Sequence, residues 1–447
     1  MNWLIEKIKD GGEQNAVIFK EHEYSYNALY EHICADYERI KNTFKPGEVV
    51  AIVSDYSFES IALFFALHEN RNIIVPITTK VQAEIDDRIN TAGCTWYVTI
   101  KDGEWTATKR EVNEEPHQLV HQLQDGGHSG LILFSSGSTG KPKAMIHNLD
   151  NLIDTYQDKR GKKIVFLIFL MFDHIGGLNT LLNCLSMNVQ MVFPETREPD
   201  HVAHLIEKYH VFVLPASPTF LNLMLIAECH KRYDLSSVRM ITYGTEPMPE
   251  SLLIKLKEAF PSVKFLQTFG TSETGISTTS SYSSTSTFLK IDDPNTEYKI
   301  IDGELWLRSK TQIMGYLNSS MERFTDDGWF RTGDMVEEKD GYIKIVGRNS
   351  DIINVGGEKV LPSEVESVLF QMPHVNDVIV YGESNPITGQ MVVAKVLYDR
   401  EVKLSELKKL VVDFCADKLT RYKIPAKVVK MSEAEFTERF KKKRSHA

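Results

Sequence analysis

The chain has 447 residues, of which 42% are hydrophobic and 25% are charged, so we expect a globular protein of two or three domains. Its formal net charge of −10 at pH 7 argues against a general nucleic-acid-binding protein, because no positive field covers the molecule to neutralise phosphates. The five cysteines are scattered and lack the spacing of metal ligands, which predicts reduced thiols in a cytoplasmic protein.

The N-terminal part predicts a strand–helix–strand unit. Residues 1–7 lack the apolar core of a signal peptide. Residues 49–53 are typical of a buried strand, Ser57 can cap a helix that runs to Glu69, and residues 72–77 form the next strand. Such a unit implies a parallel sheet.

The same alternation of strands and helices is expected in the middle of the chain. The apolar run at residues 164–172 is far too short to span a bilayer, so we expect no membrane span. The expected elements are strands at residues 211–214, 238–243 and 264–268, and helices at residues 218–228 and 249–260. Residues 277–287 are rich in Ser and Thr and are expected to form a flexible loop.

The last hundred residues or so predict a small α+β unit. Just before it, Asp340-Gly341 predicts a tight hairpin turn between strands at residues 334–336 and 342–346. Ser363 and Glu366 have the spacing of a capping box for the helix that follows. Further strands are expected at residues 375–381 and 391–397, then a helix at residues 405–419. A boundary near residues 347–351 gives an N-terminal domain of residues 1–347 and a C-terminal domain of residues 348–447.

Three glycine- and hydroxyl-rich loops each follow a short apolar strand. They read Ser135, Ser136, Gly137, Ser138, Thr139, Gly140, Lys141, Pro142 and Lys143; Gly244, Thr245, Glu246 and Pro247; and Phe269, Gly270, Thr271, Ser272 and Glu273. Ligands of open α/β sheets bind at the carboxyl edge of the strands, so the loops are expected to meet around one nucleotide. This pattern favours an ATP-using enzyme.

The first loop has the chemistry of a phosphate-binding loop without matching the Walker pattern. Ser135 stands where that pattern has Gly, and Pro142 follows Lys141 where Ser or Thr is required. Its backbone N–H groups, hydroxyls and lysines still suit a polyphosphate. A solvated Ser/Gly turn with surface lysines explains this loop equally well when it is taken alone.

Two further motifs are Trp-Phe-Arg-Thr-Gly-Asp at residues 329–334 and Gly-Arg-Asn-Ser-Asp at residues 347–351. With these five ordered motifs the chain resembles the adenylate-forming superfamily, which includes acyl- and aryl-CoA synthetases, adenylation domains of nonribosomal peptide synthetases and firefly luciferase. The resemblance runs from about Tyr24 to Lys441, and Ala144 replaces the last Gly of the family's phosphate loop. It implies an α/β fold: a large N-terminal domain of layered sheets and helices, and a small α+β C-terminal domain that acts as a mobile lid.

The resemblance also implies how ATP is held. All three loops contact the nucleotide, with the Phe269 ring stacked on adenine and Ser272 donating to the α-phosphate. Asp334 and Arg348 hold the ribose hydroxyls; a surface salt bridge is the alternative for Arg348. Glu273 and Thr139 are the implied ligands of Mg²⁺, and a carboxylate oxygen suits that ion.

The family places a His at the rim of the acid pocket, and this gating role transfers to His174. In amino-acid-activating relatives a nearby Asp holds the substrate ammonium, but the position of Asp173 next to His174 does not assign it that role. The pocket walls are expected to include Phe172, His174, Ile175, Tyr243 and Thr271.

The catalytic lysine of the family is expected at Lys441. Counted from residues 422–425 (Tyr-Lys-Ile-Pro), Lys441 falls in register with the family's Thr-x-x-Gly-Lys, with Phe440 in place of Gly. A lysine there would bridge the substrate carboxylate and the α-phosphate. Lys442 is a competing candidate, and a frayed basic terminus is the alternative interpretation.

The same domain carries a second implied site. Gly356 and Gly357 resemble the loop that approaches the active site during thiol transfer, where a chain without side chains lets a pantetheine thread come close. A plain turn explains them equally well. Ser350 stands where the family hinge usually carries Asp or Lys, two residues after Arg348.

These expectations describe an AMP-forming acid–thiol ligase that binds ATP, Mg²⁺ and a small carboxylic acid. The acid forms an acyl adenylate with release of pyrophosphate, and a thiol then displaces AMP. Coenzyme A is the first expected acceptor, and the phosphopantetheine of an acyl carrier protein is the alternative. A non-catalytic nucleotide-binding relative is the alternative of a different class, motivated by Ala144, Ser350 and Phe440. The short N-terminal end resembles compact aryl-type ligases, including o-succinylbenzoate-CoA synthetases; the acid itself is left open.

Overall fold

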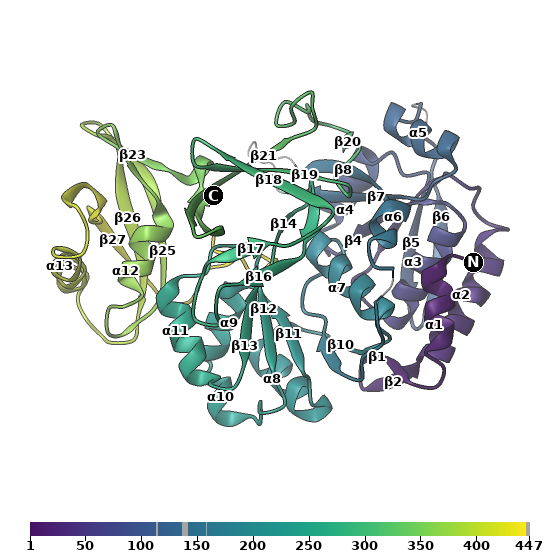
Figure 1. Ribbon diagram of the computed structural model, residues 1–447, viewed down its shortest axis with the longest axis horizontal. Helices are drawn as coiled ribbons and strands as arrows, with labels where there is room; N and C mark the ends of the chain where they lie inside the picture. Colours follow the sequence, from purple (N-terminus) through teal and green to yellow (C-terminus); the bar gives the residue numbers. More distant parts are fainter. Residues whose placement is uncertain (113–114, 136–141, 158, 444–447) are drawn as a thin grey trace.

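The computed structural model describes residues 1–112, 115–135, 142–157 and 159–443. Its large N-terminal domain contains two seven-stranded sheets (Figure 1). The first sheet, in the order β13-β12-β11-β9-β10-β1-β2, is parallel except at β1–β2. Its strands are β1 (Asn15–Phe19), β2 (His22–Ser25), β9 (Val165–Leu167), β10 (Gln190–Phe193), β11 (Val213–Ala216), β12 (Met240–Tyr243) and β13 (Lys264–Gln267).

The second sheet has the order β20-β8-β7-β4-β3-β5-β6 and a parallel centre formed by β7, β4, β3 and β5. Its strands are β3 (Val49–Val53), β4 (Ile73–Ile77), β5 (Trp96–Lys101), β6 (Glu104–Lys109), β7 (Gly130–Ser135), β8 (Lys143–Asn148) and β20 (Gly315–Tyr316). The predicted strand–helix–strand unit is confirmed as β3, α3 (Phe58–Glu69) and β4. The Ser57 hydroxyl caps α3 by accepting from Ser60 N at 3.1 Å.

Helices fill the space around both sheets. Helices α3 and α7 (Ile175–Ser186) share one apolar cluster with residues of both sheets, and the buried residues of α3 lie on every side of the helix, as expected of a helix in the interior. The other helices of this domain are α1 (Trp3–Asp10), α2 (Tyr26–Ile40), α4 (Gln82–Thr91), α5 (Gln118–Gly126), α6 (Leu149–Asp154), α8 (Pro199–Tyr209), α9 (Pro218–Ile226), α10 (Cys229–Arg232) and α11 (Glu250–Ala259).

Strand β11 begins and ends two residues later than predicted, and it contains Pro215. A proline cannot donate to a ladder, so it is unexpected in a central strand. Here β9 pairs with β11 only at Val213, whereas β12 pairs along the whole strand. Pro215, which has no N–H to donate, therefore lies beyond the point where β11 pairs with β9. The two strands are not hydrogen-bonded to each other there.

An antiparallel six-stranded sheet completes the large domain. Its strands are β16 (Thr279–Ser281), β17 (Leu289–Ile291), β18 (Thr296–Ile301), β19 (Glu304–Ser309), β21 (Phe330–Lys339) and β22 (Tyr342–Arg348), beside a ribbon of β14 (Phe269–Thr271) and β15 (Gly275–Ser277). The predicted hairpin is confirmed, with positive φ at Asp340 and Gly341. The prediction of a flexible loop at residues 277–287 is wrong in its first half, because Thr279 and Ser281 hydroxyls bond to the backbone of Gln267.

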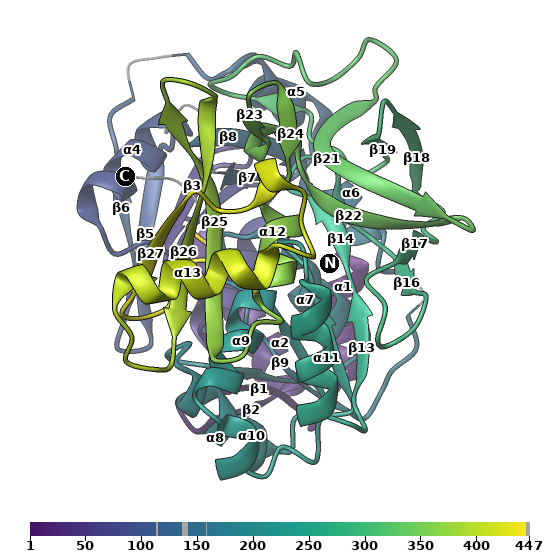
Figure 2. The same cartoon turned by 90° about the vertical axis from the view of Figure 1, so that its left-hand side faces the viewer.

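The C-terminal domain packs two helices on a five-stranded sheet, as Figure 2 shows from its own side. Its elements are η1 (Asn349–Asp351), β23 (Ile353–Val355), β24 (Glu358–Val360), α12 (Pro362–Leu369), β25 (Val375–Asn385), β26 (Gly389–Tyr398), α13 (Leu404–Cys415), η2 (Arg421–Lys423) and β27 (Lys427–Met431). The predicted α/β fold with a large and a small domain is confirmed. The boundary at residues 347–351 stays a prediction.

The predicted capping box at Ser363 and Glu366 is wrong. Helix α12 has no side-chain cap; the Ser363 hydroxyl donates to Val346 O instead, and Glu366 accepts from Val380 N at 3.0 Å. Both side chains thus take partners in neighbouring strands, because a tertiary partner can outcompete a local one.

The two domains touch where α9 and α11 of the large domain meet β25 and the end of α12. Asn222 donates to Asn376 O at 3.0 Å, and Lys255 donates to Phe370 O at 3.1 Å. No helix within the described ranges has both the length and the apolar character needed to cross a membrane.

Candidate active site

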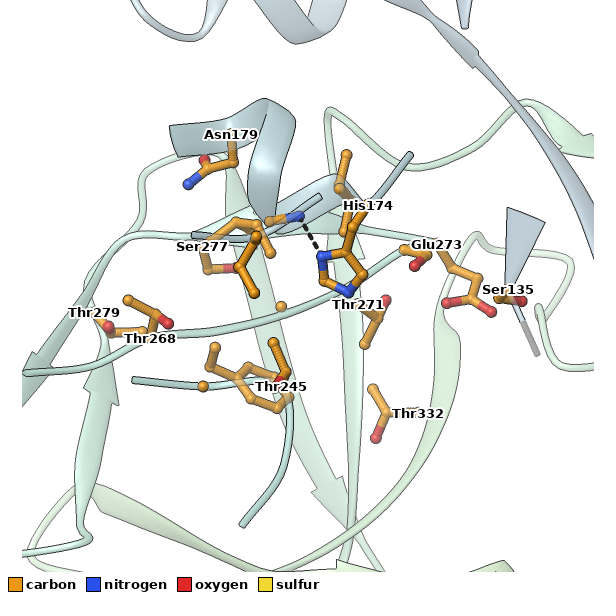
Figure 3. A pocket seen from close by; sticks show the side chains of 18 of the residues that line it. Ser135, His174, Asn179, Thr245, Thr268, Thr271, Glu273, Ser277, Thr279 and Thr332 are labelled. Atoms are coloured by element: carbon orange, nitrogen blue, oxygen red, sulfur yellow. Dashed lines mark hydrogen bonds between the residues drawn. The ribbon is translucent and has the colours of Figure 1, made fainter. Parts of the chain in front are cut away.

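One cavity of about 2150 Å³ collects the predicted nucleotide-binding loops. In Figure 3, Glu273 lies close to Ser135, while His174 and Thr245 point into the same space from other elements. The predicted loop residues that line it are Ser135, Lys143, Gly244, Thr245, Phe269, Gly270, Thr271, Ser272 and Glu273. Arg348 and Lys441 line it too. Residues 136–141, which include Thr139, lie outside the described residues.

Two predicted residue pairs and the single residue Asp334 do not join these walls. Glu246 and Pro247 come directly after Gly244 and Thr245 in their loop, but they do not line the cavity themselves. Both oxygens of Glu246 are engaged, one by Thr219 N at 2.8 Å and the other by Lys442 N at 3.1 Å. Gly356 and Gly357 form the turn between β23 and β24, with φ of 63° and 92°, and lie away from the cavity walls.

The loop after β12 places the hydroxyl of a predicted residue, Thr245, at the cavity. A Cβ at Gly244 would come within 2.6 Å of Thr268 Oγ1, so only glycine fits there. Thr245 follows with φ of 73°, a costly conformation for a β-branched residue. Its Oγ1 is buried and has no hydrogen-bond partner in the described part of the chain. A buried donor of this kind is satisfied when a ligand accepts from it.

Phe269 lines the cavity from the ribbon strand β14. It is 9% exposed and packs in the apolar cluster of the antiparallel sheet with Leu289 and Leu305. Little of the ring is therefore open, and its stacking on adenine stays a prediction.

Asp334 and Arg348 face each other across the paired strands β21 and β22. Arg348 Nε donates to Asp334 Oδ1 at 3.1 Å. Burial raises the pKa of Asp334, and the Arg348 charge opposes that rise. Asp334 in turn raises the pKa of the Arg348 guanidinium. The pair offers both acceptor and donor capacity to a ligand that carries hydroxyl groups.

Glu273 is oriented by a tyrosine from a distant strand. Tyr316 on β20 donates its hydroxyl to Glu273 Oε1 at 3.0 Å. Burial, then the Glu273 charge, raises the pKa of Tyr316, so the phenol stays protonated and keeps donating. The backbone carbonyl of Glu273 also accepts from Ile313 N at 2.8 Å. Tyr316 was missed from the sequence because it lies 43 residues beyond its partner.

His174 is the N-cap of α7, and its ring points into the cavity (Figure 3). Its Nδ1 accepts from Gly176 N at 3.0 Å. Burial lowers the pKa of His174 well below its usual value, and the nearby charges of Lys441 and Arg439 lower it further. The ring is therefore neutral, and since Nδ1 accepts, the proton is on Nε2, which can donate.

The Asp173 carboxylate binds an arginine of the C-terminal tail. Its buried carboxylate pairs with Arg88 at 3.0 Å and with Arg439 at 3.2 Å. Arg439 also donates to Phe134 O at 3.2 Å. Both contacts use Oδ2, whereas the buried Oδ1 has no hydrogen-bond partner among the described residues. Asp173 does not line the cavity, so the structure gives no support for the ammonium-binding role considered for it. Sequence reasoning missed Arg439, whose two partners are 266 and 305 residues away along the chain.

Lys441 enters the cavity from the tail. Burial and the charges of Arg348 and Arg439 lower the pKa of Lys441 to about 8, while Glu246 and Asp334 act in the opposite direction. The ammonium group therefore lies among the same residues that surround the predicted nucleotide. Its role in catalysis stays a prediction.

Lys442 has a different environment. Its Nζ donates to Val378 O at 2.8 Å and lies 3.5 Å from Glu366 and 3.9 Å from Asp377. The three partners belong to the C-terminal domain, so Lys442 ties the tail to that domain. Both lysines line the cavity, but the Nζ of Lys442 is held by these partners, which favours Lys441 as the lysine that reaches the nucleotide.

The predicted acid-pocket walls are partly wrong. Phe172 and Tyr243 are fully buried in two different apolar clusters, whereas His174, Ile175 and Thr271 line the cavity. Alternate residues of a strand face opposite sides of the sheet. Tyr243 therefore faces the helices behind the sheet, and its neighbours Thr242 and Gly244 face the cavity.

Comparisons with known proteins agree with these features. The AMP-binding enzyme model matches residues 6–317, and the AMP-binding enzyme C-terminal domain model matches residues 364–445. The chain belongs to the AMP-binding enzyme family. The predicted superfamily is confirmed, and so is the class of AMP-forming acid–thiol ligase.

Individual relatives are distant. The chain is 25% identical to a 2-succinylbenzoate–CoA ligase of Bacillus cytotoxicus, over 97% of this chain and 95% of that one. It is 27% identical to the long-chain-fatty-acid–CoA ligase FadD13 of Mycobacterium tuberculosis, over 90% and 88%.

Solved structures share the fold. The anthranilate CoA ligase AuaEII in complex with anthranoyl-AMP has a TM-score of 0.81 at 19% identity, over 98% of this chain and 94% of that one. ATP-bound MatB from Rhodopseudomonas palustris has a TM-score of 0.80 at 20% identity, over 98% and 96%.

Proposed function

We propose that this protein activates a small carboxylic acid with ATP to an acyl adenylate and then transfers the acyl group to a thiol. The observation that carries the proposal is the meeting of Lys441, His174, Glu273 and Arg348 around one cavity, with Asp334 bonded to Arg348 behind its wall. These groups come from four separate stretches of the chain. A cation, a neutral donor and a carboxylate around one cavity suit an anionic substrate and a nucleotide.

In the first step the acid carboxylate attacks the α-phosphorus of ATP, and pyrophosphate leaves. Lys441, protonated, bridges the carboxylate and the α-phosphate as negative charge moves between them. His174 donates from Nε2 to the incoming carboxylate, and Asp334 with Arg348 holds the ribose. Such side chains act by position and charge, without a covalent bond to the protein.

The described residues offer Mg²⁺ one carboxylate ligand rather than a complete set of protein ligands. No group of three or more His, Cys, Asp or Glu side chains within the described residues could hold a metal ion. Mg²⁺ is commonly bound by one or two carboxylates together with substrate phosphates and water, and Glu273 would supply such a carboxylate. The ion would neutralise phosphate charge during pyrophosphate release. Thr139, the second predicted ligand, stays a prediction.

The second step is transfer to a thiol, for which coenzyme A is our first choice. Its support comes from the two curated relatives described above, which are CoA ligases. Gly356 and Gly357 would reach the cavity only after the C-terminal domain rotates, which is the lid motion predicted from the sequence. A carrier-protein phosphopantetheine is the alternative acceptor.

The test is a screen of carboxylic acids for ATP-dependent pyrophosphate release, with and without coenzyme A. We expect at least one acid to support release, and coenzyme A to accelerate turnover by removing the adenylate. If coenzyme A has no effect while a phosphopantetheinyl carrier protein does, the acceptor is the alternative one. Absence of acid-dependent release and of ATP–pyrophosphate exchange with every acid would contradict the proposal and favour a non-catalytic nucleotide-binding protein.

A further inference from the structure

The cavity extends well beyond the nucleotide loops, along the face of the first sheet that is turned toward α7. Alternate residues of β11, β12 and β13 line it, among them Val213, Pro215, Met240, Thr242 and Leu266. Their neighbours Leu214, Ile241 and Phe265 pack in the apolar cluster on the other side. The lining residues run from one end of the strands to the other. From Gly244 to Met240 this is roughly 13 Å at the rise of a strand.

Helix α7 forms the facing wall, and that wall is polar. Asn179, Thr180 and Asn183 line the cavity at the spacing of one helix face. Tyr156 donates to Asn179 Oδ1, so the amide N–H groups of Asn179 remain as donors. Thr180 donates to Gly176 O at 2.8 Å, so its oxygen remains as an acceptor. Away from His174, one wall of this extension is thus largely apolar and the other can form hydrogen bonds.

The far end of the extension carries positive charge. The backbone N–H of Lys162 donates to Met187 O at 2.9 Å, which fixes Lys162 beside the last turn of α7. Arg160 and Lys162 line the cavity there, with Lys159 next to them. Asp293 lines it as well, but its carboxylate is engaged by the backbone N–H groups of Thr278 and Asn295, each at 2.8 Å.

We propose that the acid used by this site is elongated and carries a second anionic group at its far end, which lies near Arg160 and Lys162. The inference rests on the proposed function and names the class of its substrate. From Gly176 to Met187 the wall of α7 is roughly 16 Å long. An extended chain advances about 3.5 Å in three bonds, so roughly ten to fourteen bonds separate the two acidic groups.

The chemistry of the walls agrees with this class. A polymethylene chain buries apolar surface against Val213, Met240 and Leu266, which is favourable. The amide groups of α7 also allow an oxygen substituent on the chain. A plain fatty acid of the same length would place a methyl group among solvated cations, and it would gain nothing from Arg160 or Lys162.

The test compares acids of matched length. Acid-dependent pyrophosphate release is measured with dodecanoic and dodecanedioic acids, with tetradecanoic and tetradecanedioic acids, and with benzoic and octanoic acids. We expect the diacids to have the higher kcat/KM. We expect their advantage to shrink at high salt, because contacts with exposed cations are screened.

Variants then locate the contact. In the double variant Arg160→Gln/Lys162→Gln, kcat/KM for the diacid should fall roughly three- to tenfold, as expected for two solvent-exposed ion contacts, with the monoacid unchanged. Lys163→Gln is the matched control, because Lys163 is exposed but does not line the cavity. Asn183→Leu should move the preference toward the monoacid by changing the polar wall alone.

The outcomes separate this inference from the proposed function. If the protein releases pyrophosphate with benzoic acid or a plain fatty acid and shows no preference for a diacid, the proposed function stands and the inference is wrong. It is also wrong if the double variant and Lys163→Gln behave alike. If no acid of any kind supports release, the proposed function fails, and the inference fails with it.

Discussion

Two neighbouring lysines in the tail both line the cavity, but their side chains have different partners. Lys441 lies in the cavity among Arg348, Asp334 and Glu246, whereas Lys442 bonds to the C-terminal domain. We expect Lys441→Ala to slow adenylate formation by ~10²–10³, the usual effect of removing one transition-state donor. Thioester formation from supplied acyl adenylate should slow much less. Single-turnover rates of the two half-reactions, measured separately, test this.

Lys443→Ala is the control for that measurement. Lys443 is exposed, one residue beyond Lys442, and its loss removes a charge from the same tail without emptying the cavity. Wild-type rates in both half-reactions for Lys441→Ala would mean that Lys441 is only a tail residue.

The lowered pKa of Lys441 gives a pH dependence. Because its pKa is about 8, the free enzyme loses this cation as the pH rises through that value. We therefore expect kcat/KM for adenylate formation, which reports the free enzyme, to decline above about pH 8. Lys441→Arg keeps its charge at higher pH, so any activity that remains should lack this decline. An identical alkaline limb in Lys441→Arg would assign the titration to another group.

At the scale of elements, the tail forms a short hairpin held by both domains. Thr437 N donates to Lys441 O at 2.8 Å. Phe440 has φ of 52° and places its ring against Phe169 and Phe220 of the large domain. Ser217 donates to Phe440 O at 2.7 Å. The residue that replaces the family's glycine thus anchors the hairpin next to Lys441.

We expect Phe440→Gly to weaken this anchor without straining the backbone, since glycine accepts a positive φ. Adenylate formation should slow about tenfold, in line with the loss of aromatic packing. Thioester formation from supplied adenylate should keep its rate, because it does not need the tail in this place. The readout is the ratio of the two half-reaction rates.

Phe436→Ala is the matched control for Phe440→Gly. The Phe436 ring stacks on Phe440 from the exposed side, so its loss should change the ratio less. Equal slowing of both half-reactions in Phe440→Gly would indicate a general loss of stability instead of a positioning role.

Elements with local signals were predictable from the sequence, and elements with distant partners were not. Ser57 and Asp340-Gly341 fixed the start of α3 and the turn of a hairpin, because both act within four residues. Ser363 and Glu366 matched an equally local pattern, yet their partners Val346 and Val380 lie in other strands. The local capping pattern could not show that distant backbone partners would compete for these two side chains.

At the scale of the molecule, the motifs predicted which loops meet but not what surrounds them. The strand-to-loop order was enough to place Gly244 and Glu273 at one edge. The orphan hydroxyl of Thr245, the Tyr316 contact and the Arg439–Asp173 pair depend on how two sheets and a tail pack. None of these contacts has a periodic or local signature, so a single sequence could not supply them.

Two buried groups, one in each domain, couple the stability of the whole molecule to pH in opposite directions. Burial lowers the pKa of His147, on β8, to about 4. Burial raises the pKa of Asp377, on β25, to about 6, and Lys442 opposes that rise. Acid therefore destabilises the fold through His147, which protonates more readily when unfolded. It stabilises the fold through Asp377, which protonates more readily when folded.

The His147 contribution can be isolated by substitution. Between pH 6.5 and 4 the unfolded chain binds a proton at His147 that the folded protein excludes, so its share of the free energy of unfolding falls by about 3 kcal/mol. We expect the stability difference between wild type and His147→Gln to shrink by about that amount as the pH drops across this window. Urea unfolding at a series of pH values measures it. His121→Gln, which removes an exposed histidine, should run parallel to wild type. A constant difference between His147→Gln and wild type would show that His147 takes up its proton in the folded protein.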